Sequence, residues 1–394
     1  MPNIFSCKKL KNGVRAGRLS LMHGVAQTPF FMPIATRGAV KHVAPWELEA
    51  SGAQIILSNT YHLLQRPGLA LLKAYGGLHN FMRWPRPILT DSGGYQVFSL
   101  GHMRKITEEG VRFRSEVDGA EVFLTPENVI DMQLTIGSDI IMVLDECPPH
   151  PASREYIERS LDRTLRWAER AKRHFKKRLH IIPAPDRGRG LAPAGIQKPK
   201  SRIMSGMIER PLLFGIVQGG IHKDLREKSA KALVGIGFDG YAIGGVSVGE
   251  PRKDKYNEIK WSLKCLPKDK PRYLMGLGRP EEIVWAVRQG VDMFDCIIPT
   301  REARHGKLYV MQKHRHRKLH KAQTFYRTVN IKNAMYAKDI KPVDALCACS
   351  LCKNFSRAYL RHLFSVSEAL AQRLATLHNL VFYLSLMKRL RDNG

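Results

Sequence analysis

Eight short apolar runs recur along the chain, and amphipathic segments lie between them. The runs are Phe30–Ile34, Gln54–Ser58, Ile88–Thr90, Ile140–Leu144, Leu212–Val217, Tyr241–Ile243, Tyr273–Met275 and Phe294–Ile298. Several are continuous rather than alternating, which is typical of strands buried on both faces. Within 153–178, Ile157, Leu161, Leu165 and Ala168 fall on one face of a helix. Eight strand–helix units predict a (β/α)8 TIM barrel of the α/β class.

Polar residues or glycines follow most of these runs at their C-terminal ends. They are Asn59-Thr60, Asp91-Ser92-Gly93-Gly94, Asp145-Glu146, Gln218-Gly219-Gly220, Gly244-Gly245 and Gly276. In a barrel of parallel strands these ends form one face, and active sites lie on that face. The pattern therefore predicts that acids far apart in the sequence share one site.

The stretch Gly290–Gly306, GVDMFDCIIPTREARHG, carries Asp292 and Asp295 on either side of a Met-Phe pair. We interpret Met293–Ile298 as a short buried strand with an acid in its middle and a basic loop at its end. A buried acid is costly unless it is paired or used, and a basic loop favours a phosphate-bearing substrate. A strand with capping acids and a solvated loop explains these residues equally well.

The chain is 394 residues long and 44% hydrophobic, enough for one large core or for a core with a small satellite. No apolar run reaches the roughly 18 residues of a membrane span. The N-terminus lacks the apolar segment of a secretory signal. It is basic, as transit peptides are, but the Asn12-Gly13 turn between alternating segments favours an early hairpin.

The net charge of +29 indicates a polyanionic partner. Nucleic acid is the first interpretation, an anionic membrane surface the second, and simple solubility the third. Two basic stretches contribute to the charge. Pro183–Gly206 is expected to be a surface loop, and Lys313–Lys321, KHRHRKLHK, is either a phosphate-contacting segment or a solvated run.

The seven cysteines include a cluster of three, which indicates metal binding in a reducing compartment rather than a disulfide framework. Cys347, Cys349 and Cys352 fit one tetrahedral zinc ion that needs a fourth ligand. His378, on an apolar helix, is the best candidate, although such a histidine is more often a core residue. Buried thiols without metal are the alternative. A closed Cys3His site would be structural, because it has no open position for chemistry.

Taken together, the motifs resemble those of tRNA-guanine transglycosylases of the bacterial type. They are NTYHL, LTDSGGYQVFSL, LDECPP, FGIVQGG, YLMGLG, VDMFDCIIPTR and CACSLC followed by a histidine, and they run through nearly the whole chain. The resemblance implies a (β/α)8 barrel over 1–330, with the N-terminal hairpin and basic insertions near 183–206 and 313–329. It implies a zinc-binding subdomain over 331–394, whose last helix packs on the barrel.

The resemblance also implies exchange of the wobble guanine in tRNA for a 7-deazaguanine, with the same stereochemistry at the sugar. Double displacement achieves this through a covalent enzyme–RNA intermediate, as in retaining glycosidases. By motif, Asp295 is the nucleophile and Asp91 is the acid/base that handles the proton of the leaving and entering bases. A capped turn is the plain structural explanation of Asp91.

The same resemblance assigns base recognition to a set of residues around these two acids. Asp145 would accept two hydrogen bonds from the guanine-like edge. Gln218 and the backbone of Gly245 would supply the complementary groups, and the Val246 carbonyl would bind the substituent at position 7. The remaining residues are Tyr95 and Met275, which would sandwich the ring, and Ser92, Gly93 and Gly94 of the turn.

The expected partner is a tRNA of the Asp, Asn, His or Tyr type with a GUN anticodon. Arg301 and Arg304, with Thr300, match the residues that read bases splayed out of the anticodon loop. Bacterial members insert preQ1 and eukaryotic members insert queuine. Cys147 and Val248 resemble the bacterial pocket, in which a bulkier side chain limits the room for queuine, so preQ1 is the expected base.

Further expectations are one structural Zn2+ per subunit, a cytoplasmic location, no membrane association and a homodimer. The dimer is expected through an aromatic cluster that matches Phe81, Tyr359 and His362, with Phe355 where a larger aromatic is usual. Family members are usually far less basic than this chain.

Three rival classes of protein are weighed: a non-catalytic tRNA-binding paralogue, a barrel glycosidase and a zinc-dependent deaminase. The presence of all three acids disfavours the first, the charge and cysteines disfavour the second, and the closed metal site disfavours the third.

Overall fold

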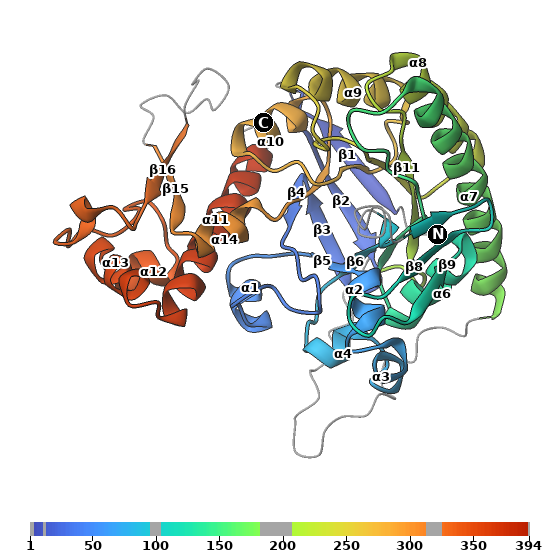
Figure 1. Cartoon of the computed structure of the whole chain (residues 1–394). Helices are drawn as coiled ribbons and strands as arrows, with labels where there is room; N and C mark the ends of the chain where they lie inside the picture. Colours follow the sequence, from blue (N-terminus) through green and yellow to red (C-terminus); the bar gives the residue numbers. More distant parts are fainter. Residues whose placement is uncertain (1–3, 11–12, 95–103, 182–206, 313–324, 393–394) are drawn as a thin grey trace.

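The computed structural model describes residues 4–10, 13–94, 104–181, 207–312 and 325–392 (Figure 1). Its centre is a sheet of eight parallel strands. They are β4 (Phe30–Met32), β5 (Ile56–Asn59), β6 (Ile88–Asp91), β10 (Ile140–Met142), β11 (Leu212–Val217), β12 (Gly240–Ile243), β13 (Arg272–Leu274) and β14 (Met293–Asp295). Most of the two predicted basic insertions, at 182–206 and 313–324, lies outside the described residues.

From β5 to β14 each strand of this sheet pairs with the next one along the chain, and β14 returns to pair with β4. Asp295 of β14 is in register with Met32 of β4. The remaining seam is joined by a parallel bridge between Ile34 and Leu57, where Leu57 N donates to the Pro33 carbonyl at 3.0 Å. The sheet is therefore a nearly closed barrel, which confirms the predicted (β/α)8 architecture.

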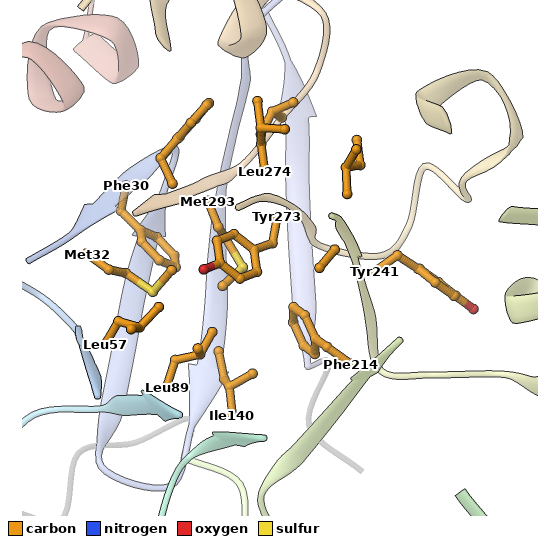
Figure 2. Close-up of a cluster of buried hydrophobic side chains, with 14 of the residues drawn as sticks. Phe30, Met32, Leu57, Leu89, Ile140, Phe214, Tyr241, Tyr273, Leu274 and Met293 are labelled. Carbon is orange, nitrogen blue, oxygen red and sulfur yellow. The ribbon is translucent and has the colours of Figure 1, made fainter. Parts of the chain in front are cut away.

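Large apolar side chains from all eight strands form the main core (Figure 2). Figure 2 shows Phe30, Met32, Leu57, Leu89, Ile140, Phe214, Tyr273 and Met293 gathered together, whereas Tyr241 points away from them. Strand residues of this kind are buried on both faces, which explains why the runs are continuous in sequence.

Helices surround the barrel. The longer ones are α6 (Pro126–Ile136), α7 (Arg154–Ile181), α8 (Lys223–Ile236), α9 (Arg252–Cys265), α10 (Pro280–Arg288) and α14 (Ala369–Asp392). The shorter ones are α1 (Pro45–Ala50), α2 (Thr60–Gln65), α3 (Leu69–Ala74), α4 (Leu78–Met82) and α11 (Ile298–Arg304). Helix α7 confirms the predicted amphipathic segment, with Ile157, Leu161 and Ala168 buried. None of the described helices is long and apolar enough to cross a membrane.

Two small antiparallel sheets accompany the barrel. The first contains β1 (Phe5–Lys9), β2 (Arg15–Leu21) and β3 (Gly24–Thr28), which confirms the predicted N-terminal hairpin. Arg15 of β2 lies 3.3 Å (Nε to Oδ1) from the Asp292 carboxylate at the start of β14, so this sheet contacts the end of the barrel where strands begin. The second contains β7 (Arg104–Ile106), β8 (Val111–Arg114) and β9 (Glu121–Leu124).

A satellite lobe follows α11 and is drawn in orange and red at the left of Figure 1. It contains β15 (Lys307–Met311), β16 (Tyr326–Asn330), the short helix η2 (Ala334–Tyr336), α12 (Ser350–Asn354) and α13 (Arg357–Ser365). Leu308 and Val329 of the hairpin share a core with the cysteine cluster. We therefore propose that the lobe starts near Ala303, earlier than the boundary predicted at 330.

Helix α14 joins the two bodies. Leu374 and Ala375 pack in the core of the lobe, whereas Phe382, Tyr383 and Leu386 pack in the core of the barrel. One continuous helix thus supplies both cores, and Figure 1 shows it between them.

The predicted strand Phe294–Ile298 is wrong in its second half. Strand β14 ends at Asp295, Ile297 is 49% exposed, and Ile298 begins helix α11. Pro299 explains the change, because its fixed φ suits the first turn of a helix and it has no N–H for a strand ladder. The basic run after it, interpreted above as a loop, is therefore helical.

Candidate active site and metal site

The C-terminal ends of the barrel strands bring together the acids that the sequence places far apart. Asp91 ends β6, Asp145 follows β10 and Asp295 ends β14. Electrostatic repulsion from Asp295 and Asp145 raises the pKa of Asp91, in addition to the larger effect of burial. The predicted single face with three carboxylates is therefore present.

Asp295 is held by two donors on one of its oxygens. The Tyr273 hydroxyl donates to Oδ1 at 2.7 Å and Gly276 N donates to the same atom at 2.9 Å. Burial raises the pKa of Asp295, and these two hydrogen bonds oppose the rise. Among the described residues, no hydrogen bond from another residue to the second oxygen, Oδ2, is found.

Asp91 is held by the neighbouring strand and by its own turn. Asn59 Nδ2 donates to both carboxylate oxygens at 2.8 Å, and Gly93 N donates to Oδ1 at 3.0 Å. Burial raises the pKa of Asp91 to about 7, and the hydrogen bonds from Gly93 and Asn59 reduce that rise. A carboxyl group with a pKa near neutrality is suited to both giving and taking a proton.

Asp145 is 7% exposed and pairs with an amide from the next strand. Gln218 Nε2 donates to Asp145 Oδ2 at 2.7 Å. Burial raises the pKa of Asp145 to about 6, and the charge of Glu146 contributes. A Cβ at Gly94 would lie 2.9 Å from the Asp145 carbonyl oxygen and 3.1 Å from Oδ1, so only glycine lets the turn approach this acid.

The groups predicted to face a base lie beside Asp145. A Cβ at Gly245, where φ is +61°, would lie 2.3 Å from Gln218 Oε1, so these two residues are in direct contact. Gln218 Oε1 is buried without a partner among the described residues. A cavity of about 100 Å³ adjoins Gln218 and Gly245 and is lined also by Val248 and Glu250.

For three residues that the sequence analysis singled out, no hydrogen bond to the three carboxylates is seen in the described part of the chain. Met275 is partly buried against the main core. Tyr95 lies outside the described residues. Asp292, which the sequence pairs with Asp295, is at the opposite end of β14 and contacts Arg15. It is therefore part of the barrel core rather than of the site.

The basic residues after Asp295 lie on helix α11. Arg301 is exposed, with Nη2 3.8 Å from Glu302, and Arg304 is half-buried beside it. Burial lowers the pKa of Arg304, and the Arg301 charge adds to the effect. Thr300 is buried and donates to the Ile297 carbonyl at 3.2 Å, so its hydroxyl stabilises the helix start.

Three residues of the site went unassigned from the sequence, namely Asn59, Tyr273 and Arg226. The first two bond the carboxylates described above. Arg226 is completely buried on α8 and contacts the loops after β11 and β12. The sequence offers one indication of its importance. Arg226 falls on the buried face of α8 together with Ser229 and Leu233, and an arginine is rare in such a place unless it is paired.

The satellite lobe contains a group that can hold a metal ion. The ligand atoms of Cys347, Cys349, Cys352 and His378 all lie within 4.8 Å of one another. His378 Nδ1 is 3.5 Å from Cys349 Sγ and 3.3 Å from Cys352 Sγ, and its Nε2 lies 2.8 Å from the Tyr309 carbonyl oxygen. That carbonyl directs Nδ1 toward the thiols, as second-shell partners do at zinc sites. The donor set fits one tetrahedral zinc ion.

A second group, His23, His79 and Asp139, is also close enough to bind a metal. Its carboxylate already accepts from His23 N at 2.8 Å and Ile88 N at 2.9 Å, with His23 Nδ1 at 3.0 Å and His79 Nε2 at 3.1 Å. Two backbone N–H donors and two histidine rings already occupy the carboxylate. We therefore regard it as structural.

Comparison with known proteins agrees with this geometry. A family model described as Queuine tRNA-ribosyltransferase matches residues 9–393. The chain belongs to this family. A queuine tRNA-ribosyltransferase from Acinetobacter baylyi is 48% identical over 378 residues, which cover 96% of this chain and 87% of that protein. One from Halothermothrix orenii is 46% identical over 384 residues, covering 98% and 91%. As a member of this family the chain is an enzyme, a pentosyltransferase.

Proposed function

We propose that this enzyme exchanges the wobble guanine of tRNAs with GUN anticodons for preQ1. The observation that carries the proposal is the meeting of Asp295, Asp91 and Asp145 at the barrel mouth, where Asp295 and Asp145 are buried, Asp91 is partly buried, and each is held by polar partners. Family membership supports tRNA and a guanine-type base as the two substrates.

Asp295 is proposed as the nucleophile. With Oδ1 fixed by Tyr273 and Gly276, Oδ2 is the atom available to attack the anomeric carbon of the ribose. The bond from that carbon to the base nitrogen breaks as the bond to the carboxylate oxygen forms. The product is a covalent enzyme–RNA intermediate, and a second displacement by the new base restores the original stereochemistry.

Asp91 is proposed as the acid/base. Its pKa of about 7 allows the protonated carboxyl group to give its proton to the leaving guanine. The resulting carboxylate then takes the proton from the ring nitrogen of the entering base as the new glycosidic bond forms. One residue thus serves both halves of the exchange, and no other co-reactant is needed.

Recognition of the base is assigned to Asp145, Gln218, Gly245 and Val246. The Asp145 carboxylate, the Gln218 Nε2 that donates to it, and the unpartnered Gln218 Oε1 offer donors and acceptors for the edge of a purine-like ring. Ser92, Gly93 and Gly94 shape the turn that approaches Asp145. Met275 and Tyr95 remain the proposed faces of the sandwich.

Val248 lines the cavity beside Gln218, and it is one residue of the proposed size filter that would admit preQ1 and limit the room for the bulkier queuine. Cys147 is the other residue of the proposed size filter. A queuine-inserting enzyme is the alternative within the same family. Incorporation of each base into the same unmodified tRNA, measured in competition, distinguishes the two.

Arg301 and Arg304 are proposed to contact the anticodon loop, and the net charge of +29 is consistent with a polyanionic substrate. We place the enzyme in the cytoplasm, where tRNA is available.

Zinc is proposed for the Cys3His group. Tyr359 and His362 are exposed on α13, and the Phe355 and Tyr359 rings stack 5.0 Å apart. They are proposed, with Phe81, as part of a homodimer interface.

The deciding experiment measures incorporation of radiolabelled guanine into unmodified tRNA with a GUN anticodon, with Asp295→Ala alongside. Label in the parent enzyme and none in the variant is the expected result. If a folded, zinc-bound parent incorporates no label, the proposal is wrong and a non-catalytic tRNA-binding protein becomes the better explanation.

A further inference from the structure

Arg226 is a fully buried cation that donates five hydrogen bonds, four to carbonyls at the C-terminal ends of β11 and β12, beside the proposed base-recognition groups, and one to Glu258. Its Nη1 donates to the Gly244 carbonyl at 2.6 Å and its Nη2 to the Gly245 carbonyl at 3.0 Å. Its Nε and Nη1 also donate to the carbonyls of Gly220 at 2.8 Å and Val217 at 3.2 Å. One side chain therefore joins the loop after β11 to the loop after β12.

The bonds to Gly244 and Gly245 set the direction of two peptide groups. In a trans peptide the C=O and the N–H point in opposite directions. Because the Gly244 carbonyl points at Arg226, the Gly245 N–H points away from it, and the same holds for the Gly245 carbonyl and the Val246 N–H. In the described part of the chain, neither N–H has an acceptor. Both are thus left as donors.

Gln218 is one of the two residues between Val217 and Gly220, so the bonds to those two carbonyls act on it. Its backbone N donates to Ser229 Oγ at 3.1 Å, and Ser229 lies one turn after Arg226 on the same helix. Its side chain then extends to Asp145, and Oε1 stays unpartnered at Gly245. Helix α8 consequently fixes the Gln218 backbone on both sides.

The charge of Arg226 is balanced from helix α9. Glu258 Oε2 lies 2.6 Å from Nη2, and both side chains are excluded from solvent. A buried cation of this kind persists only when it is paired and hydrogen-bonded. Glu258 also lines the cavity beside Gln218 and Gly245, so the ion pair lies directly against the loops that it holds.

We propose that Arg226, held by Glu258, is a positioning residue for base recognition, which aims the Gly245 N–H and Gln218 at the carbonyl-bearing edge of a guanine-type base. This inference rests on the proposed function, and it adds the residue that sets the geometry of the base-recognition pocket. The loops themselves are short and glycine-rich, and glycine peptides adopt many conformations unless they are held.

The test compares Arg226→Lys with Arg15→Lys in the guanine-incorporation assay. Arg15 is the matched control, because it is also a buried arginine paired with a buried acid but lies at the opposite end of the barrel. Lysine keeps the charge but cannot bond four carbonyls and a carboxylate at once. We expect Arg226→Lys to raise the KM for guanine about tenfold, with the KM for tRNA within about twofold of the parent value.

Arg15→Lys is expected to lower thermal stability without changing the KM for guanine. Equal KM values for guanine in the two lysine variants would overturn the inference while leaving the exchange activity established. Absence of label with the parent enzyme would overturn both. If Arg226→Lys does not fold, Glu258→Gln replaces it, since it removes the balancing charge with little change of shape, and the same rise in the KM for guanine is required.

Discussion

The Tyr273 hydroxyl donates a 2.7 Å hydrogen bond to Oδ1 of Asp295 inside the barrel mouth. The two residues come from neighbouring strands, β13 and β14, and Tyr273 is fully buried. The hydrogen bond favours the ionised form of Asp295, because it opposes the effect of burial on the pKa of that carboxyl. A tyrosine thus helps to keep the proposed nucleophile charged.

Replacing this tyrosine by phenylalanine tests the relationship. Tyr273→Phe removes the hydrogen bond, so the pKa of Asp295 should rise and the ionised fraction at neutral pH should fall. We expect the acidic limb of the pH–rate profile to move to higher pH, and kcat at pH 7 to fall roughly tenfold. An unmoved acidic limb in a variant of normal thermal stability would contradict the proposed role.

Asp145 links the site to the stability of the fold. Burial raises its pKa to about 6 from an ordinary value of 3.8, so the folded protein holds the proton over a pH range in which the unfolded chain has lost it. The stability tied to that proton is present at low pH and is lost as the pH rises through about 6. Asp145→Asn removes this dependence and can still accept from Gln218.

The free energy of unfolding of Asp145→Asn, relative to the parent, should therefore increase by roughly 2 kcal/mol between pH 4 and pH 8. Denaturant titrations at both pH values measure it. Guanine incorporation should be lost at the same time. A relative stability that does not change with pH would show that this carboxyl is not held protonated by burial.

The cysteine cluster predicts a dependence of the lobe on metal. Cys349→Ser removes one of four ligands, so we expect less than one zinc ion per chain by atomic absorption and a melting temperature lower by several degrees. Cys7→Ser is the control, because Cys7 is an exposed cysteine on β1, away from the lobe. Equal zinc content in the two variants would refute the ligand assignment.

The ion pair between Arg15 and Asp292 is expected to stabilise the other end of the barrel. Arg15→Met leaves a buried acid without its partner, which should cost about 2–3 kcal/mol at pH 8. Burial raises the pKa of Asp292 to about 7, so this acid is protonated at pH 5 and the cost should be smaller there. A cost that is equal at both pH values would argue against an ionic contact.

Parts of this molecule follow from sequence patterns that depend on neighbours along the chain. The continuous apolar runs specify buried strands, and the spacing of Leu161 and Ala168 specifies the inward face of α7. Three thiols within six residues form a group that can hold a metal ion, because their separation along the backbone is short. The motifs around Asp91 and Asp295 indicated the protein family in the same manner, because each motif is a short continuous stretch of sequence.

Tertiary structure decided the rest, because it depends on contacts between distant parts of the chain. Asp292 and Asp295 are three residues apart, yet one pairs with Arg15 at the start of β14 and the other ends the strand among the proposed catalytic groups. Only barrel closure separates these roles. Arg226 acquires its role in the same way, since the carbonyls and the acid that hold it come from three segments that only packing brings together.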